Sequence, residues 1–350
     1  MVNLPAIIVM AGIRVLLYCI FIGALAGCAG PTSPVINFYH WKSLSNLDSS
    51  QISYLKEVGT QRVYMRVFDV HYIEDGYQKG PYPVASLQVP LTELSASGVE
   101  IVPVVYIENE VFLSSYEYSL DELPKLLYEE IGRVLVENGW TEPIEEIQID
   151  CDWTPSTREK FFEFVGHLRN LSQIQLSATI RLHQLKYVDE TGVPPVDHGV
   201  LMFYNMGDLR SPNETNSILN LEEARKYVSN DMRYPLKLVP ALPNFSWGVL
   251  FRNDKIQSIL NNVSPDLYES SLFAKSAENE YECRERCFIS GSWIYPGDLI
   301  RLESVEDALF MEAHQLLKKS ITQFDEVIVY HLSNELSSRL PPDRLKDLLP

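Results

Sequence analysis

The sequence predicts an α/β protein folded as a (β/α)8 barrel, the TIM barrel, and two observations support this prediction. Eight short apolar runs alternate with longer helix-like segments between residues 35 and 333. The chain has 350 residues, which suits one such barrel with insertions. A doubly wound open sheet is the alternative architecture, because it shows the same alternation.

The strand candidates are short and rich in β-branched and aromatic residues. They are 35–41, 62–70, 99–108, 145–153, 174–183, 199–206, 236–243 and 325–333. Helix-like segments lie between most of them, at 48–58, 119–138, 155–171, 217–230 and 304–322. The helix over 155–171 is the clearest, because Thr154 or Ser156 can cap it ahead of an apolar stripe.

Three segments depart from an ideal barrel. The connection 183–198 has little helical pattern and contains two adjacent prolines. A long insertion, 250–303, precedes the last strand, and the helix over 334–349 is short. We therefore expect one barrel domain over 35–350 that carries the insertion.

The N-terminal segment predicts a lipoprotein. Residues 1–27 contain one cation followed by an apolar run too short for a good membrane span, which is typical of a signal peptide. The small residues before Cys28 resemble a bacterial lipobox, so we expect lipid on Cys28 and a tether over 28–34. The alternative is an uncleaved anchor, and Met10 is a second candidate start.

Residue Ala29 favours the outer membrane of a Gram-negative cell, because no aspartate follows the lipidated cysteine. In that oxidising envelope Cys283 and Cys287 are expected to form a small-loop disulfide, with two free thiols as the alternative. Cys151 is expected to be a buried free thiol.

The formal net charge of −18 argues against nucleic acid and anionic lipid as partners. Membrane contact is therefore expected through the N-terminal lipid only. No nucleotide-binding, metalloprotease or nucleophile-elbow motif is present. We expect no cofactor and no metal, since Arg66 and Arg181 would oppose a divalent ion at the acidic cluster considered next.

Ionisable side chains gather on the inward faces of four strands. Because apolar residues must face the helices, alternate positions face the barrel axis. The inward set is Tyr64, Arg66, Phe68, Tyr106, Glu108, Gln148, Asp150, Asp152, Ser177, Thr179, Arg181 and His183. Their charged members lie near the carboxyl ends of the strands, where barrel enzymes keep their chemistry. Two interpretations stay open: an acid/base or substrate-orienting cluster in a cleft, or an Asp–Arg network that plugs the barrel.

Two motifs resemble glycoside hydrolase family 18, the chitinase-like barrels. The stretch IQIDCDW resembles the family's D-x-x-D-x-D-x-E strand, with Asp150 and Asp152 at its second and third acidic positions. The stretch LMFYNMGD resembles its M-x-Y-D/N strand through Met202, Tyr204 and Asn205. The chain also resembles poorly characterised bacterial envelope proteins related to glycoside hydrolases. The resemblance implies a sugar-cleaving barrel in which the substrate's acetamido group is the nucleophile.

The departures from that motif bear on the mechanism. Ile147 stands at the first aspartate position and Thr154 at the catalytic glutamate, and threonine cannot protonate a glycosidic oxygen. Three accounts stay open. In the first, Glu108 is the general acid, Asp152 is the second carboxylate and Asp150 lies beside it. In the second, the barrel binds a glycan without cutting it. In the third, only the fold is shared with the family.

Aromatic and polar residues extend the candidate site. Four aromatic residues are candidates for stacking against a sugar ring: Trp41, Trp153, Trp247 and Tyr330. Trp247 is the first choice among them. The alternative is that these large aromatic side chains only cover the end of the barrel. Candidate ligand-binding residues are Arg66, Arg181, Tyr204, Asn205, His40 and His183, and both histidines have a structural alternative. His71, Tyr72 and the segment 74–83 are expected to form a loop over the same end, as a lid or as a subsite wall.

These observations predict a cell-envelope lipoprotein similar to glycoside hydrolases that acts on a polysaccharide or amino-sugar glycan. The alternative is a non-catalytic glycan-binding or scaffold lipoprotein built on a degenerate barrel.

Overall fold

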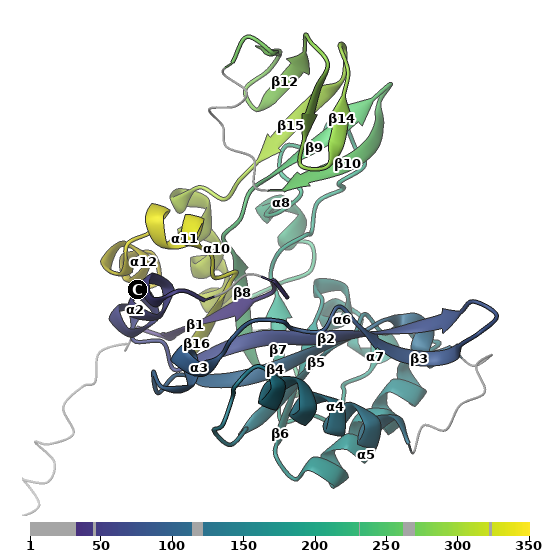
Figure 1. The fold of residues 1–350 in the computed structure, drawn as a ribbon. Coiled ribbons are helices and arrows are strands. Elements are labelled where there is room, and N and C mark those ends of the chain that lie inside the picture. Colours follow the sequence, from purple (N-terminus) through teal and green to yellow (C-terminus); the bar gives the residue numbers. More distant parts are fainter. Residues whose placement is uncertain (1–32, 45–46, 114–121, 231, 262–269, 322–323) are drawn as a thin grey trace, which may run out of the picture. The chain divides into compact units, whose positions relative to one another are not determined.

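Eight parallel strands close into a barrel, as the sequence predicts (Figure 1). The computed structural model describes residues 33–350 except 45–46, 114–121, 231, 262–269 and 322–323. The strand order is β1–β16–β8–β7–β6–β5–β4–β2, and pairing of β1 with β2 closes the ring, so the open-sheet alternative is wrong. The strands are β1 Val35–His40, β2 Arg62–Glu74, β4 Glu100–Ile107, β5 Glu146–Asp150, β6 Gln175–Ile180, β7 His198–Met202, β8 Lys237–Pro243 and β16 Glu326–Tyr330.

Each barrel strand separates two apolar layers, because successive side chains point to opposite faces. The outer faces join one large cluster with the helices, to which Ile147, Ile149 and Cys151 belong. The inner faces form a smaller cluster that includes Tyr39 and Tyr64. The predicted alternation along β5 is therefore confirmed, and it turns Asp150 toward the axis.

The longer helices cover the outside of the barrel and have local reasons to form. For example, the helix Ser49–Val58 starts at a capping box between Asp48 and Gln51 and ends at Gly59, whose φ of +83° suits a left-handed cap. The longer helices are α2 Ser49–Val58, α4 Leu123–Glu137, α5 Arg158–Ser172 and α10 Asp307–Ser320. The shorter ones are α3 Thr92–Ser95, η1 Asn109–Phe112, α6 Leu182–Lys186, α7 Val188–Thr191, α8 Leu221–Ala224, α11 Asn334–Arg339 and α12 Pro342–Leu348.

Strand β2 differs from its prediction in both length and register. It continues to Glu74 and pairs antiparallel with β3 (Lys79–Val84), so the expected lid loop over 74–83 is a hairpin. Its pairing with β4 shifts between Arg66 and Phe68. An extra residue in a strand reverses the faces beyond it. Phe68 therefore packs in the outer cluster instead of facing inward, and Asp69 takes its place at the barrel mouth.

The insertion between β8 and β16 folds as a five-stranded antiparallel sheet and a two-stranded hairpin. The sheet order is β10–β9–β15–β12–β11, and a separate apolar cluster that includes Leu250 and Ile300 supports it. It begins at Trp247, just before the predicted boundary of 250. The strands are β9 Trp247–Arg252, β10 Lys255–Asn261, β11 Phe273–Lys275, β12 Glu280–Cys283, β13 Cys287–Ile289, β14 Ser292–Ile294 and β15 Leu299–Glu303.

Two connecting segments and one cysteine pair differ from what the sequence predicts. The connection 183–198 carries the short helices α6 and α7, and the helix expected over 217–230 shrinks to α8. Cys283 and Cys287 are free cysteines here in place of the expected disulfide, and the Cys283 thiol donates to the Glu285 carbonyl at 2.9 Å.

The signal peptide over 1–27, Cys28 and residues 28–32 of the tether lie outside the described residues. Within the described part of the chain, no helix has both the length and the apolar character needed to span a membrane.

Candidate functional site

A cleft of about 320 Å³, here called the mouth cleft, lies among the carboxyl ends of the barrel strands. Five of the twelve inward residues predicted from the sequence line it: Arg66, Tyr106, Asp150, Asp152 and Arg181. Its lining residues are Trp41, Arg66, Asp69, Tyr106, Asp150, Asp152, Arg181, Met202, Tyr204, Asn205 and Tyr330. The β/α alternation brings them together because parallel strands deliver their last residues to one end of the barrel.

Two arginine–aspartate pairs dominate the charge of the mouth cleft. Arg181 Nε and Nη2 lie 2.6 and 3.2 Å from the two carboxylate oxygens of Asp152, a bidentate geometry. Arg66 likewise pairs with both oxygens of Asp69, with Nε at 2.6 Å from Oδ1, and its guanidinium lies 5.8 Å from the Trp41 ring centroid. Both oxygens of each carboxylate therefore already accept hydrogen bonds.

Asp150 lies deeper than Asp152. Its side chain accepts a hydrogen bond from Thr179 Oγ1 at 2.6 Å, and the residue is only 3% exposed. Burial raises the pKa of Asp150 above its ordinary value, although the Arg181 charge and the Thr179 hydrogen bond oppose this. Burial also disfavours the charge on Arg181, but the carboxylates of Asp150 and Asp152 outweigh burial and raise the arginine's pKa.

Aromatic side chains form one wall of the mouth cleft. The Tyr330 ring lies 5.1 Å from that of Tyr204 and 5.8 Å from that of Trp41, measured between centroids. The Tyr204 hydroxyl lies 2.7 Å from Met202 Sδ, and burial raises the pKa of Tyr204 well above its ordinary value. Burial also raises the pKa of Tyr106 to about 12, with help from Asp152 and Asp150. These hydroxyls stay protonated at neutral pH and remain hydrogen-bond donors.

A second cleft of about 550 Å³, the side cleft, adjoins the mouth cleft through Asp152, Arg181, Tyr204 and Asn205. Thr154 and His183 also line it. Burial lowers the pKa of His183, so this imidazole is more readily neutral than usual. Trp153 borders this cleft, but its side chain is fully buried.

The buried position of Trp153 has clear packing partners. Its ring stacks on Phe161 with centroids 5.1 Å apart, and its Nε1 donates to the Thr191 carbonyl at 2.9 Å. The platform expected at Trp153 is therefore wrong, because that ring belongs to the contact between the barrel and α5.

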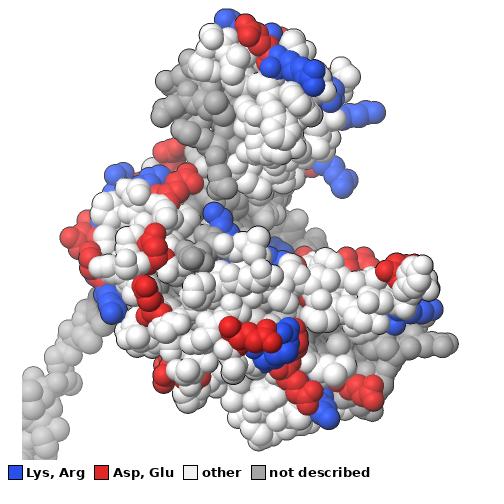
Figure 2. All heavy atoms as spheres, in the orientation of Figure 1, with Lys and Arg blue, Asp and Glu red and all other residues white. Residues whose placement is uncertain are grey.

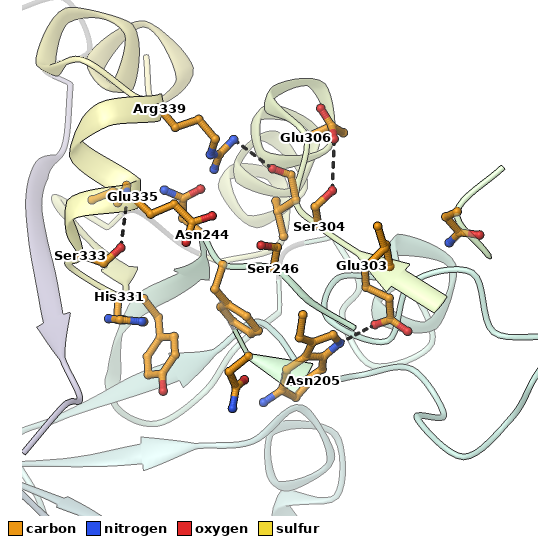
Figure 3. Close-up of a pocket in the computed structure, with 18 of the residues that line it drawn as sticks. Asn205, Asn244, Ser246, Glu303, Ser304, Glu306, His331, Ser333, Glu335 and Arg339 are labelled. Carbon is orange, nitrogen blue, oxygen red and sulfur yellow. Dashed lines mark hydrogen bonds between the residues drawn. The ribbon is translucent and has the colours of Figure 1, made fainter. Parts of the chain in front are cut away.

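A third hollow of about 610 Å³, the insertion pocket, lies between the barrel and the base of the insertion (Figure 3). Asn205 and Tyr330, which line the mouth cleft, also line this pocket. Phe245 and Trp247 add an aromatic pair with centroids 5.2 Å apart. Asn205 lines all three spaces, so they lie next to one another at the barrel mouth; together they are here called the groove.

Buried charge fixes the position of Trp247. Its indole Nε1 donates to Glu303 Oε2 at 2.9 Å, and the Ser217 hydroxyl donates to the same oxygen at 2.5 Å. Arg301 Nε donates to the other oxygen of Glu303 at 2.7 Å, and both members of this ion pair are almost fully buried. The network ties the first and last strands of the insertion to the loop after β7.

Two predicted site residues lie outside the groove. Glu108 lines none of the three spaces, and its Oε2 lies 3.4 Å from the backbone nitrogen of Tyr72, on the β2–β3 side. His40 is 2% exposed, and burial lowers its pKa to about 3, which keeps it neutral. Glu108 therefore does not line the mouth cleft beside Asp152, and His40 is too buried to reach a ligand.

Sequence reasoning missed Asp69, Asn244 and Glu303. The bulge that turns Asp69 inward has no residue signature in RVYMRVFDV, because neither glycine nor proline marks it. Asn244 and Glu303 lie where the insertion meets the barrel, and only tertiary structure shows that these segments meet. Within the described ranges, no cluster of three His, Cys, Asp or Glu residues is arranged to hold a metal ion.

Comparison with known proteins finds structural neighbours only, since no family model and no curated sequence matches the chain. A GH18 chitinase from Cycas revoluta, solved in complex with (GlcNAc)4, is 10% identical, with coverage of 90% of this chain and 100% of that chain at a TM-score of 0.50. The spore cortex-lytic enzyme SleL from Bacillus cereus is 13% identical, with coverages of 91% and 74% and a TM-score of 0.49. A chitinase from Chromobacterium violaceum is 10% identical, with coverages of 86% and 95% and a TM-score of 0.48. The Cycas enzyme shows that the chain shares the barrel fold of GH18 chitinases.

Proposed function

We propose that this chain is a cell-envelope glycan-binding protein whose barrel mouth holds an oligosaccharide without hydrolysing it. The groove suits a sugar chain, because aromatic rings line it beside planar charged and amide groups. Indole and phenol faces stack on the apolar faces of pyranose rings, and arginine, aspartate and asparagine pair with their hydroxyl groups. A chitinase of the same fold was solved with an oligosaccharide bound, which supports a glycan as the ligand class.

One observation carries the non-hydrolytic part of the proposal: of the three carboxyl groups that line the mouth cleft, Asp69 and Asp152 each have both oxygens paired with an arginine, and Asp150 is only 3% exposed. A glycosidase needs a carboxylic acid that can reach the glycosidic oxygen with its proton. Both oxygens of Asp152 accept from Arg181, and those of Asp69 accept from Arg66. The motif resemblance supports the same reading, because it sets Thr154 at the position of the acid, and Thr154 lines the side cleft.

Hydrolysis is a second candidate function because of Asp150. Burial raises the pKa of this carboxyl, so it keeps a proton to higher pH than an ordinary aspartate does. In this account Asp150 supplies the proton and Asp152 orients the substrate. Its weakness is access, since Asp150 is 3% exposed and its side chain already accepts from Thr179.

A glycan panel tests the proposal. Neutral, N-acetylated and uronic-acid hexasaccharides are titrated into the domain from residue 33 onward by calorimetry, and the mixtures are then analysed by mass spectrometry. The proposal expects saturable binding of at least one hexasaccharide, with the sugar recovered intact. Absence of binding to every member of the panel would overturn glycan binding, and cleavage of a bound member would favour the second candidate.

The envelope location rests on the lipobox resemblance around Cys28. In cells, Cys28→Ser is expected to move the full-length chain from the membrane fraction to the soluble fraction and to abolish labelling by radioactive palmitate. An unchanged membrane fraction together with no palmitate labelling of the wild-type chain would contradict a lipid anchor.

A further inference from the structure

Asn244 presents an unusual group to the insertion pocket. It follows β8, is 6% exposed and lines the pocket, and neither its Oδ1 nor its Nδ2 has a hydrogen-bond partner among the described residues (Figure 3). Its backbone nitrogen donates to the Tyr330 carbonyl at 2.6 Å, which fixes the residue where β8 and β16 end. A buried carboxamide without partners destabilises a free protein, so it calls for an explanation.

The surroundings of Asn244 indicate what would pair with it. Phe245, Trp247 and Tyr330 line the same pocket and offer ring faces of the size of a pyranose. His331 is neutral at physiological pH, because burial lowers its pKa to about 4. A carboxamide offers donors and an acceptor together, which complements hydroxyl groups and amides rather than a lone ion.

The charges lining the pocket disfavour an anionic ligand. Glu303 is paired with Arg301, so the remaining acidic lining residues Glu278, Glu306 and Glu335 face the basic ones, Lys42 and Arg339. Of the two cations, Arg339 also lies 3.5 Å from Asp307, outside the pocket lining. A uronic acid or sulfated sugar would meet this excess of negative charge, whereas an uncharged sugar would not.

We propose that the insertion pocket is a second sugar subsite, in which Asn244 hydrogen-bonds an uncharged pyranose unit of the glycan held in the mouth cleft. The inference rests on the proposed function, because the two units belong to one oligosaccharide. Asn205 and Tyr330, shared by the mouth cleft and the insertion pocket, lie along the path between them. The pocket then sets a minimum chain length and a preference for neutral glycans.

Variants at Asn244 and ligands of two lengths test this subsite. N-acetylchitobiose, N-acetylchitohexaose, cellohexaose and hexagalacturonate are titrated into the wild-type domain, into Asn244→Leu and into Asn170→Leu, an exposed asparagine of α5 outside the groove. The subsite predicts that Asn244→Leu weakens binding of the neutral hexasaccharides about 10-fold and does not change the affinity for the disaccharide. The control variant Asn170→Leu is expected to bind every sugar as the wild-type domain does. Asn244→Leu is also expected to raise Tm by about 2 °C, because it removes the unpaired amide.

The outcomes separate this inference from the proposed function. If the wild-type domain binds hexasaccharides and Asn244→Leu binds them equally well, or if hexagalacturonate binds more tightly than the neutral sugars, the subsite is wrong and glycan binding stands. If the wild-type domain binds none of the four probes, both fail. Asn244→Ser, with a smaller change of volume, gives the same comparison if the leucine variant does not fold.

Discussion

The two ends of the barrel contain the same kinds of charged residues in opposite surroundings. At the amino end of the strands, Glu146 accepts from Ser177 Oγ at 2.5 Å and lies 3.3 Å from His198 and 3.7 Å from Arg62. At the carboxyl end, Asp152 pairs with Arg181 at 2.6 Å. The Glu146 side chain is 2% exposed, whereas the Asp152 side chain is 45% exposed.

This contrast teaches that charge inside a barrel does not by itself indicate function. The amino end is a sealed cluster, here called the plug, in which hydrogen bonds join Glu146, Ser177, Gln148 and Tyr39. From the sequence, such a plug is an interpretation only for the aspartates and arginines at the carboxyl end. The carboxyl end has similar pairs, but they border open space. Exposure, more than residue type, separates a structural cluster from a candidate binding site.

The largest effect should come from breaking the plug. Glu146→Ala is expected to lower the free energy of unfolding by about 3 kcal/mol, because it removes the buried acceptor of Ser177 and the carboxylate beside His198 and Arg62. Urea denaturation measures the loss. Glu100→Ala is the matched control, since Glu100 also pairs with Arg62 but is 54% exposed, and it should cost under about 1 kcal/mol. An equal loss of unfolding free energy in the two variants would show that buried and exposed ion pairs contribute alike to stability.

The open pair should show the reverse pattern. Asp152→Ala is expected to weaken oligosaccharide binding by about 10- to 100-fold and to change the free energy of unfolding by less than about 1 kcal/mol, because the pair is partly solvated. Calorimetric titration and urea denaturation measure the two quantities. Asp197→Ala breaks an exposed pair with Arg169 outside the groove and should leave binding unchanged. A large stability loss with unchanged affinity would assign Asp152 to a plug.

Trp247→Phe sharpens the comparison at the far end of the groove. It keeps a smaller aromatic face and removes the indole donor to Glu303, so we expect about 3-fold weaker binding of a hexasaccharide. Trp293→Phe, at an exposed position of the insertion that lines none of the three spaces, controls for the change in aromatic content. Comparable losses in both variants would show that Trp247 has no special position.

The smallest effect concerns the pH dependence of Asp150. Burial raises its pKa above the ordinary value of 3.8, so on rising pH the unfolded chain releases this proton before the folded chain does. The stabilisation from the protonated carboxyl is full below pH 3.8 and is lost as pH rises through the folded-state pKa. Asp150→Asn should therefore gain stability relative to wild type between about pH 4 and neutrality. A stability difference that stays constant with pH would contradict a raised pKa.

The sequence predicted the barrel because strand and helix periodicities repeat eight times, and each repeat needs only local information. It predicted the inward set on β5 and β6 for the same reason, since Thr179, Asp150, Arg181 and Asp152 follow the alternation. It misplaced Phe68 because one bulge reverses the faces. It also misplaced Trp153 and Glu108, because what lies beyond a strand end depends on tertiary packing.

The most direct test of the account is prolonged incubation of the wild-type domain with a hexasaccharide that it binds. Equimolar protein and sugar are kept at neutral pH for days and then analysed by mass spectrometry, with Asp152→Ala in parallel. The account predicts a saturable calorimetric titration for wild type and an intact hexasaccharide in both samples. Shorter products that form with wild type and not with Asp152→Ala would contradict binding without hydrolysis.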